Sequence, residues 1–407
     1  MAEVANLVKN KRNVLGLSQD DFAKYIGVDG GSLVEAWEVG SKKPTAARMR
    51  IIESIVEPPF KNNNENNSFT FIDLFAGIGG FRIPFQAAGG KCVFSSEWDK
   101  FSQKTYAANF GDYPQGDITK IDVNDIPAHD VLLGGFPCQA FSHAGKRQGF
   151  HDTRGTLFFD VQRILAHHRP KAFVLENVKG LLSHNGGKTL ETIINVLTET
   201  GDVDVPAAVE LDEETRKDIS KGLGYHVSIG IINAVEHGVP QKRERLFIVG
   251  VDPNQVNIDF KDFNFFESIK TVDKDNRKTL KDVLIPNSEV DEKYTITDIA
   301  WQWHQDRLKL NQAKGYGFGY SLFTHDDDYG NTLTARYHKD GNEFLVCQKD
   351  IGKNPRKLTP RECARLQGFP EEFIIDVVSD TQSYTQFGNS VAVPVIRSIA
   401  EQLIKLF

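Results

Sequence analysis

The stretch FTFIDLFAGIGG occupies residues 69–80 and consists of an apolar, β-prone run followed by a glycine-rich loop. A strand that ends in such a loop and leads into a helix is the first unit of an open α/β sheet, and glycines let the backbone approach a ligand closely. The spacing Gly77-Ile78-Gly79-Gly80 is not the G-x-G-x-x-G of the dinucleotide-binding enzymes. The stretch therefore predicts an α/β fold with a ligand at the end of its first strand, and it does not indicate a nicotinamide enzyme.

Acidic and aromatic side chains follow the next predicted strands. Glu97 comes directly after the run 92–96, where a carboxylate can hold a pair of ribose hydroxyls, and Trp98 offers a flat surface for adenine. We expect a third strand to end at Asp117-Ile118, with a carboxylate suited to the exocyclic amine of adenine. These residues predict a nucleoside site beside the glycine loop.

The hexapeptide 134–139, Gly-Gly-Phe-Pro-Cys-Gln, places Cys138 on a sharp turn after the apolar run 131–133. A turn of this kind can present a thiolate nucleophile. A thiol with an ordinary pKa of about 8.5 is only a few per cent ionised at neutral pH, so nucleophilic attack needs a favourable local environment. The alternative, taken from this turn alone, is a buried cysteine that ends a core strand.

Two later segments carry further charged candidates. The buried-strand run 172–175 delivers Glu176 at its carboxyl end, where open α/β sheets bind ligands, although Glu176 could instead charge a helix start or pair with Lys179. Arg243 and Arg245 are separated by one residue on an extended segment and so point to the same face. For the arginines the alternative is a solvated basic turn.

An interruption of all periodicity at residues 57–68, rich in proline and asparagine, predicts a linker after an N-terminal module of residues 1–56. In that module Ser18 is a predicted helix N-cap, with Asp21 three residues later, and Gly27 permits a tight turn. The pattern resembles the helix-turn-helix of the Cro/repressor family.

In that family the second helix enters the major groove, and here it is expected at about residues 31–38. Ser32 and Lys42 are then predicted DNA contacts, and the module is expected to bind an operator, with a dimer as one arrangement. Gly30-Gly31 departs from the polar residues usual at the start of this helix. The alternative is a small helical module used for protein contacts.

Composition sets broader limits. The chain has 407 residues, of which 40% are hydrophobic and 25% charged, enough for two or three globular domains. Its net charge of -7 gives no general attraction to nucleic acid, so DNA binding would need local basic patches. Four scattered cysteines without C-x-x-C spacing indicate neither a disulfide framework nor a metal site. The absence of a long apolar run or a signal peptide predicts a cytoplasmic protein without membrane contact.

Six motifs occur in the order in which they are found in the DNA cytosine-5 methyltransferases, and the chain resembles that family over nearly everything after the linker. They occupy residues 73–80, 134–142, 176–178, 241–245, 356–369 and 388–394. The resemblance implies a Rossmann-like S-adenosylmethionine-dependent domain at 69–255, completed by 385–407. It also implies a smaller, irregular, β-rich target-recognition domain at 256–384, after the all-α N-terminal module. The last helix, within 391–407, is expected to pack beside the first strand.

The resemblance also implies roles for the candidates. Cys138 would add to carbon 6 of cytosine, and a protonated Glu176 would donate to N3. Arg245 would bind the cytosine carbonyl oxygen, and Arg243 would help to order the site. S-adenosylmethionine would be the methyl donor, and no metal is expected. The residues implied to bind it are Phe75, Gly77, Gly79, Gly80, Glu97, Trp98, Asp117, Ile118, Pro137, Asn389 and Val391.

A base paired in a duplex must leave the stack to reach such a pocket. The loop at about 139–155 is expected to close over double-stranded DNA, with contacts from Gln139, Ser142, Lys146, Arg147 and Arg154. Segments 315–320 and 334–341 resemble enzymes that methylate short palindromes beginning with two cytosines and ending with two guanines (CCGG or CCNGG), with Arg336 as a guanine contact. Otherwise they form a hairpin needed only for folding. The acidic insertion 202–218 is interpreted as a surface excursion.

Several rival functions remain or are excluded. A zinc-dependent cytosine deaminase needs a second cysteine after two residues and an upstream H-x-E, and both are missing. An RNA-directed relative of the same family stays open, as does a transcriptional regulator in which methylation is secondary. Within the family, the expected role is protection of DNA from a partner restriction endonuclease.

Overall fold

The computed structural model describes residues 1–62, 66–136, 157–201, 203, 221–317 and 319–407. Its centre is a six-stranded sheet with the strand order β2-β1-β3-β4-β6-β5. The strands are β1 (Phe69–Leu74), β2 (Gly90–Ser96), β3 (Val131–Gly135), β4 (Ala172–Val178), β5 (His226–Asn233) and β6 (Glu244–Val251). The first four pair in parallel, whereas β6 is antiparallel to both β4 and β5. The predicted α/β class and the predicted first strand are confirmed.

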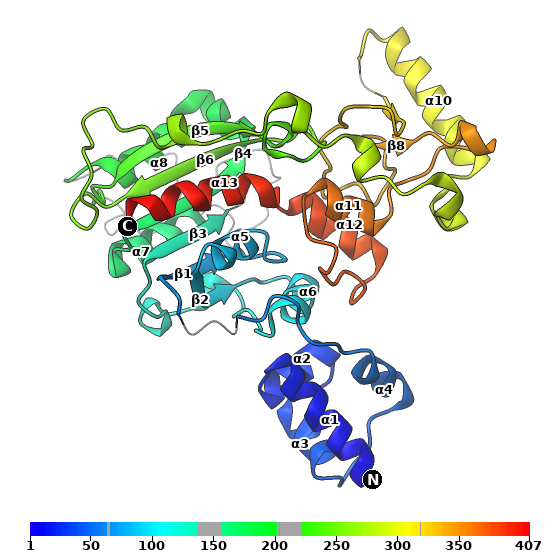
Figure 1. Ribbon diagram of the computed structural model, residues 1–407, viewed down its shortest axis with the longest axis horizontal. Helices are drawn as coiled ribbons and strands as arrows, with labels where there is room; N and C mark the ends of the chain where they lie inside the picture. Colours follow the sequence, from blue (N-terminus) through cyan, green and yellow to red (C-terminus); the bar gives the residue numbers. More distant parts are fainter. Residues whose placement is uncertain (63–65, 137–156, 202, 204–220, 318) are drawn as a thin grey trace, which may run out of the picture.

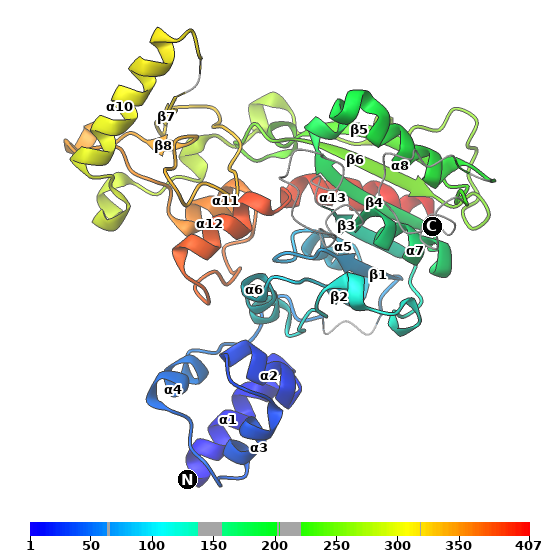
Figure 2. The same ribbon diagram turned by 180° about the vertical axis from the view of Figure 1, so that it is seen from behind.

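Helices cover both faces of this sheet (Figures 1 and 2). On one face, α7 (Leu157–His168) and α8 (Lys188–Thr198) share a core with alternate residues of the strands, such as Ile72 and Leu74. On the other face, α5 (Arg82–Ala87) and α13 (Val393–Leu403) share a core with Phe69 and Phe71. The last helix therefore packs beside the first strand, as the sequence predicts. Alternation of side chains along β1 supplies both cores.

The N-terminal module consists of α1 (Ala2–Leu15), α2 (Gln19–Ile26), α3 (Gly31–Glu38) and α4 (Ala46–Glu53). The Ser18 side chain accepts a hydrogen bond from the Asp21 N–H, and Gly27 ends α2 with φ 72°. Gly31 N–H donates to the Asp20 carboxylate at 2.7 Å, and a Cβ on Gly31 would lie 2.6 Å from that same oxygen. The close approach of α2 to the start of α3 thus explains why glycine stands where the helix-turn-helix pattern usually has a polar residue.

This module shares a hydrophobic cluster with α6 (Lys100–Phe110), a helix of the sheet domain (Figure 1). Ala107 and Ala108 lie in the same cluster as Leu17 and Tyr25. The cation of Lys104, also on α6, lies 5.6 Å from the centre of the Tyr25 ring. The N-terminal module is therefore packed against the sheet domain rather than carried on a free tether.

Removal of residues 1–56 is expected to lower the unfolding temperature by several degrees while leaving DNA methylation measurable at low temperature. The truncation exposes Ala107, Ala108 and their apolar neighbours, and loss of apolar burial destabilises a fold. Calorimetry of the full and truncated chains checks this, with Ser32→Ala, on the exposed side of α3, as a control that should not shift unfolding. Equal unfolding temperatures would show that the shared cluster contributes nothing.

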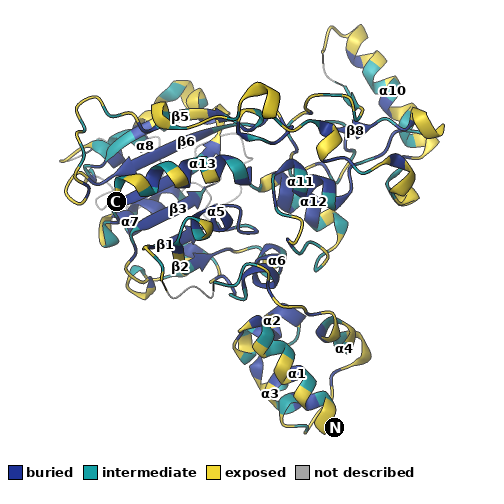
Figure 3. Cartoon of the chain, viewed as in Figure 1, coloured by how far each residue is buried: buried dark blue, intermediate teal, exposed yellow. Residues whose placement is uncertain are grey.

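The region 256–384 corrects one prediction. It is irregular, but in its described part the only strands are the two-residue β7 (Leu322–Phe323) and β8 (Leu345–Val346), so the β-rich interpretation is wrong. It carries instead the helix α10 (Asp298–Ala313), followed by α11 (Pro360–Leu366) and α12 (Asp380–Asn389). The Thr297 side chain caps α10 by accepting from the Ala300 N–H. The helix escapes a search for apolar periodicity because it buries only His304 and Asn311, and Figure 3 shows it largely exposed.

Among the described residues, no helix is both long and apolar enough to traverse a bilayer. The proposed surface excursion at 202–218 falls almost entirely outside the residues described.

Candidate active site

The carboxylate of Glu176 and the guanidinium of Arg245 form an ion pair of 3.0 Å between Oε1 and Nε. In the antiparallel pairing of β4 with β6, Arg245 lies opposite Val178, two residues beyond Glu176. Residues two apart on a strand share a face, so this register brings the two side chains together. Each remains slightly exposed, at 13% for Glu176 and 17% for Arg245, so the pair lines a surface that a ligand can reach.

Burial raises the pKa of the Glu176 carboxyl, and the nearby charges of Arg245 and Arg243 partly oppose this rise by lowering it. Desolvation disfavours the ionised carboxylate, so a larger share of the group stays protonated near neutral pH than for an exposed glutamate. The pKa of Glu176 is thus shifted in the direction that a proton donor at this position needs.

The end of β3 is fixed beside Glu176. Gly135 pairs with Glu176 in the parallel register, and a Cβ on Gly135 would lie 3.5 Å from Glu176 Oε2. The buried Asn177 side chain donates a hydrogen bond to the Phe136 carbonyl at 2.9 Å. Pro137 and Cys138 lie outside the described residues, and the described part of the chain ends at Phe136, one residue after Gly135.

Arg243 is buried and lies at the junction of three segments. Its guanidinium donates to the carbonyls of Leu333 at 2.9 Å, Gly388 at 3.1 Å and Ser390 at 2.6 Å. Burial, with repulsion from Arg245, lowers its pKa to about 9 against a smaller opposing effect of Glu176. Arg243 therefore braces the site through backbone carbonyls, whereas Arg245 faces Glu176.

The glycine-rich loop follows β1 and bends sharply. Phe75 adopts φ 55°, a left-handed conformation that is strained for a non-glycine residue, and Gly77 and Gly79 have φ 54° and 87°. A Cβ on Gly79 would lie 2.2 Å from the Phe110 ring, and one on Gly80 would lie 2.8 Å from Val391. Glycine is required by this packing, and the contact of Gly80 with Val391 places the 388–394 motif against the loop.

Glu97 and Trp98 follow β2 at the same edge of the sheet. The Glu97 carboxylate accepts hydrogen bonds from the N–H groups of Gly77 and Asp99, both at 2.8 Å, and burial raises its pKa. Each carboxylate oxygen has a second lone pair available for a ligand hydroxyl. Trp98 is 77% exposed, so a large apolar ring lies in contact with solvent next to the Glu97 carboxylate.

Asp117 corrects a second prediction, because the third strand ends at Gly135 and not at Asp117. Asp117 instead caps a 3-10 turn over Ile118–Lys120, with its carboxylate accepting from the N–H and hydroxyl of Thr119. Aspartate favours such local turns because its short side chain reaches the backbone two residues on. Gln115 pairs with Ser95 and Glu97 of the β2 end, so Asp117 still lies near that edge of the sheet.

Asp73 is a residue that the sequence motifs contain but to which they assign no role. It is fully buried near the end of β1, and within the described part of the chain neither of its carboxyl oxygens has a hydrogen-bond partner. Burial raises its pKa well above the ordinary value, with Arg82 lowering it and Glu97 raising it. A buried polar group without a partner is costly and points to a missing ligand or water. The sequence signal that could have pointed to Asp73 is an acidic residue within the otherwise apolar end of β1.

The predicted DNA contacts are spread over the molecule. Arg336, Ser32 and Lys42 are exposed, the first in the 256–384 region and the others on the N-terminal module. Asn389, a predicted cofactor contact, is also exposed, at the end of α12. The remaining DNA candidates fall outside the described residues, namely Gln139, Ser142, Lys146, Arg147 and Arg154. Within the described residues, no group of three or more His, Cys, Asp or Glu side chains is placed to hold a metal ion.

Comparison with known proteins identifies the family. The family model of the C-5 cytosine-specific DNA methylases matches residues 69–206 and 213–405. The chain is 49% identical to type II methyltransferase M.SsoII of Shigella sonnei over 98% of each chain. It is 44% identical to type II methyltransferase M.HpaII of Haemophilus parainfluenzae, over 86% of this chain and 93% of that protein.

Among solved structures, the Dnmt2 methyltransferase of S. pombe aligns with a TM-score of 0.64 at 19% identity, over 83% of this chain and 99% of that one, which supports the fold. The residues that the family model matches include the sheet, the Glu176–Arg245 pair and the backbone carbonyls that Arg243 contacts. The chain belongs to the C-5 cytosine-specific DNA methylase family and is a DNA cytosine-5 methyltransferase of the type found in type II restriction-modification systems.

Proposed function

We propose that the chain methylates carbon 5 of a cytosine extruded from a short palindromic duplex, with S-adenosylmethionine as methyl donor and with Cys138, Glu176, Arg243 and Arg245 as the catalytic set. The observation that carries the proposal is the Glu176–Arg245 pair at the end of β4, beside the end of the strand that leads to Cys138. Glu176 pairs with Gly135, the last residue of β3, so a proton donor and a cation lie beside the strand end that precedes Cys138 in the sequence.

The residues at the sheet edge fit the proposed methyl donor. The glycine loop admits close backbone approach, Glu97 can accept ribose hydroxyls, and the exposed Trp98 can stack on adenine. The unpartnered Asp73 carboxyl supplies a further polar group beneath the loop. Phe75, Asp117, Ile118, Pro137, Asn389 and Val391 complete the proposed set. When bound, S-adenosylmethionine supplies an electrophilic methyl group.

The protein's own residues prepare the cytosine for attack on that group. The Cys138 thiolate forms a bond to carbon 6, and the ring electrons that this addition releases make carbon 5 nucleophilic. Glu176 donates its proton to N3 and so neutralises the charge that develops on the ring, while Arg245 holds the carbonyl oxygen. Once carbon 5 carries the methyl group, a base takes the carbon 5 proton, the electrons of that C–H bond restore the double bond between carbons 5 and 6, and the thiolate leaves carbon 6. Arg243 keeps these groups in register through its three carbonyl contacts.

Bisulfite sequencing of DNA from a methylation-deficient host that expresses the protein tests this function. We expect protected cytosines within one palindrome that begins with two cytosines and ends with two guanines, and no protection with Cys138→Ala. Host DNA without protected cytosines would contradict the proposal, and bisulfite sequencing of RNA from the same cells would show whether RNA is methylated instead. Such a palindrome would also identify the cut site of a partner restriction endonuclease.

A second proposed activity is binding of an operator by the N-terminal module. Support comes from the α2–turn–α3 geometry, with Ser18 capping α2 and with Ser32 and Lys42 exposed. Footprinting on the DNA upstream of the coding region tests it, and the footprint should weaken with Lys42→Ala. A symmetric footprint would indicate a dimer, and an unchanged footprint after removal of residues 1–56 would refute the assignment.

A further inference from the structure

The segment 330–333 of the recognition region lies alongside the segment 240–243, which leads into the catalytic strand β6. Three hydrogen bonds join the two segments: Gly330 N–H donates to Pro240 O at 3.0 Å, Lys242 N–H donates to Gly330 O at 2.9 Å, and the Thr332 hydroxyl donates to Lys242 O at 2.5 Å. The first two form a parallel bridge between Gln241 and Gly330. We call this the 240/330 ladder. It is short, because the recognition region offers no longer strand here.

Two buried side chains extend the ladder by binding both backbone polar groups of one residue of the recognition region, Leu333. Gln241 Oε1 accepts the Leu333 N–H at 2.9 Å, and Arg243 Nη1 donates to the Leu333 carbonyl at 2.9 Å. Gln241, Arg243 and Leu333 are all at most 2% exposed. Both polar groups of Leu333 are therefore fixed by residues that belong to the catalytic segment, in a place that water does not reach.

Other polar atoms of the same two side chains bind the ends of helices α11 and α12. Gln241 Nε2 donates to Leu366 O at the end of α11, and Arg243 Nη2 donates to Gly388 O and Ser390 O at the end of α12. A Cβ on Gly388 would lie 2.2 Å from the Thr334 carbonyl carbon, so the backbone after Leu333 rests directly on α12. Gln241 and Arg243 thus join the recognition segment to both helices.

The positions of the ladder along the chain give it a consequence for specificity. Arg245, which faces Glu176, lies two residues after Arg243, and the exposed Arg336 lies three residues after Leu333. A shift of the 330–333 segment would therefore move Arg336 relative to the cytosine pocket. An error of about 1 Å in such an arrangement is enough to cost a large factor in rate.

We propose that Gln241 is a positioning residue for target specificity: together with Arg243 it holds the Leu333 peptide so that the recognition segment and the catalytic strand keep one fixed register. The inference rests on the proposed function, because it assumes that Arg245 binds the cytosine and that the segment around Arg336 reads the flanking base pairs. Gln241 itself contacts no substrate in this account.

The test compares Gln241→Leu with wild type on the cognate duplex and on a duplex with one flanking base pair changed. The leucine leaves the buried Leu333 N–H without an acceptor, a loss of about 1.4 kcal/mol or more, which corresponds to about tenfold in an equilibrium. We expect the ratio of kcat/KM for the two duplexes to fall by about tenfold or more. KM for the cognate duplex should rise, and the Kd of S-adenosylmethionine should stay within about twofold.

Gln348→Leu is a matched control. Gln348 is also buried in the recognition region and donates to Thr295 and to the Asn354 carbonyl, but it is not part of the ladder. It should lower the unfolding temperature to a similar degree and leave the discrimination ratio unchanged. Gln241→Glu keeps an oxygen facing the Leu333 N–H but replaces the Nε2 donor to Leu366 O, so it should recover part of the discrimination that Gln241→Leu loses.

Three results would overturn the inference. The first is an equal loss of kcat/KM on both duplexes with Gln241→Leu, and the second is the same loss of discrimination with Gln348→Leu. The third is a Gln241→Glu variant that discriminates no better than Gln241→Leu or, if the leucine variant does not fold, one that has lost its discrimination relative to wild type. Failure of the proposed function gives a different result, namely a wild-type protein that leaves carbon 5 unmethylated on every duplex.

Discussion

Glu176→Gln is expected to lower kcat by about 10²–10⁴-fold, the usual contribution of a positioned general acid. Glutamine has nearly the same shape but carries no acidic proton for N3 of the cytosine. The ion pair with Arg245 at 3.0 Å becomes a hydrogen bond from the charged guanidinium to the neutral amide oxygen, so the cation keeps its place while proton donation is lost. Single-turnover methylation of a saturating duplex measures this effect free of product release.

The pH dependence of the reaction provides a second readout. Burial raises the pKa of Glu176, and the protonated form is the active one, so the rate should decline as the pH rises through that pKa. Ionisation of the cysteine requires the opposite change, which gives a bell-shaped profile in the wild type. In Glu176→Gln the decline assigned to residue 176 should disappear.

Glu244→Gln is the matched control for this prediction. Glu244 is the first residue of β6 and pairs with Lys179, the residue after β4, at 3.1 Å, at the exposed ends of the same two strands. Its replacement should change the rate little, because a solvent-exposed ion pair contributes at most about 1 kcal/mol. Full activity in Glu176→Gln, or equal losses in the two variants, would remove Glu176 from the role of acid.

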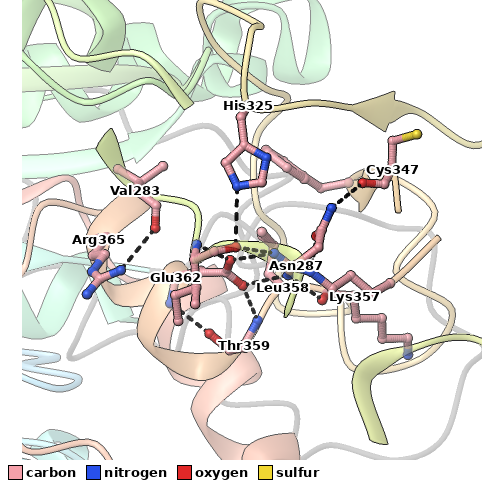
Figure 4. A network of polar contacts seen from close by, with 12 residues as sticks. Val283, Asn287, His325, Cys347, Lys357, Leu358, Thr359, Glu362 and Arg365 are labelled. Atoms are coloured by element: carbon pink, nitrogen blue, oxygen red, sulfur yellow. Dashed lines mark hydrogen bonds and ion pairs between the residues drawn. The ribbon is translucent and has the colours of Figure 1, made fainter. Parts of the chain in front are cut away.

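Arg356→Met is expected to lower the free energy of unfolding by about 3–5 kcal/mol, because it leaves the buried Glu362 carboxylate without its counter-charge. Arg356 and Glu362 are both fully buried and form two parallel hydrogen bonds of 2.8 and 2.9 Å. Arg356 also donates to Asn287 Oδ1, and Glu362 accepts the N–H groups of Ile285 and Thr359. Figure 4 shows Glu362, Thr359 and Asn287 converging on this network.

A double-mutant cycle separates the pair from its surroundings. Glu362→Gln alone should also destabilise, because it leaves Arg356 charged and buried, whereas the double variant should lose less than the sum of the two singles. Arg365→Met is the control. Arg365 lies on α11 with Glu362 and pairs with Glu371, which is 63% exposed. The substitution should cost no more than about 1 kcal/mol. Equal effects of Arg356→Met and Arg365→Met on urea unfolding would contradict the account.

Residues 69–80 predicted the fold because strand propensity, turn residues and the following helix all indicate the same strand–loop–helix unit. The run 69–74 is β-prone, the glycines permit the left-handed turn, and the helix α5 follows. The site was predictable for a related reason, since the carboxyl ends of adjacent parallel strands meet at one edge and bring Glu176 beside the end of β3. Local sequence pattern and sheet topology are therefore enough to predict that Glu176 lies beside the end of β3.

Contacts between distant segments were beyond the reach of local patterns. Asn287 and Arg356 are 69 residues apart in the sequence, and Gln241 and Leu333 are 92 residues apart. The residues around each of them give no indication of which distant residue it contacts. The helix α10 was missed because it exposes Ile299 and Trp303 and buries little, so its sequence lacks an apolar stripe. Asp117 was misplaced because an Asx turn and a strand end both favour aspartate.

Trapping of a covalent complex tests the central claim most directly. The protein is incubated with S-adenosylmethionine and a duplex that carries 5-fluorocytosine at the target, where fluorine blocks the loss of the carbon 5 substituent. We predict a complex that survives denaturation, with the nucleotide attached to the peptide containing Cys138, formed by Cys347→Ala but not by Cys138→Ala. A denatured sample without such a complex, or attachment at another residue, would contradict the account.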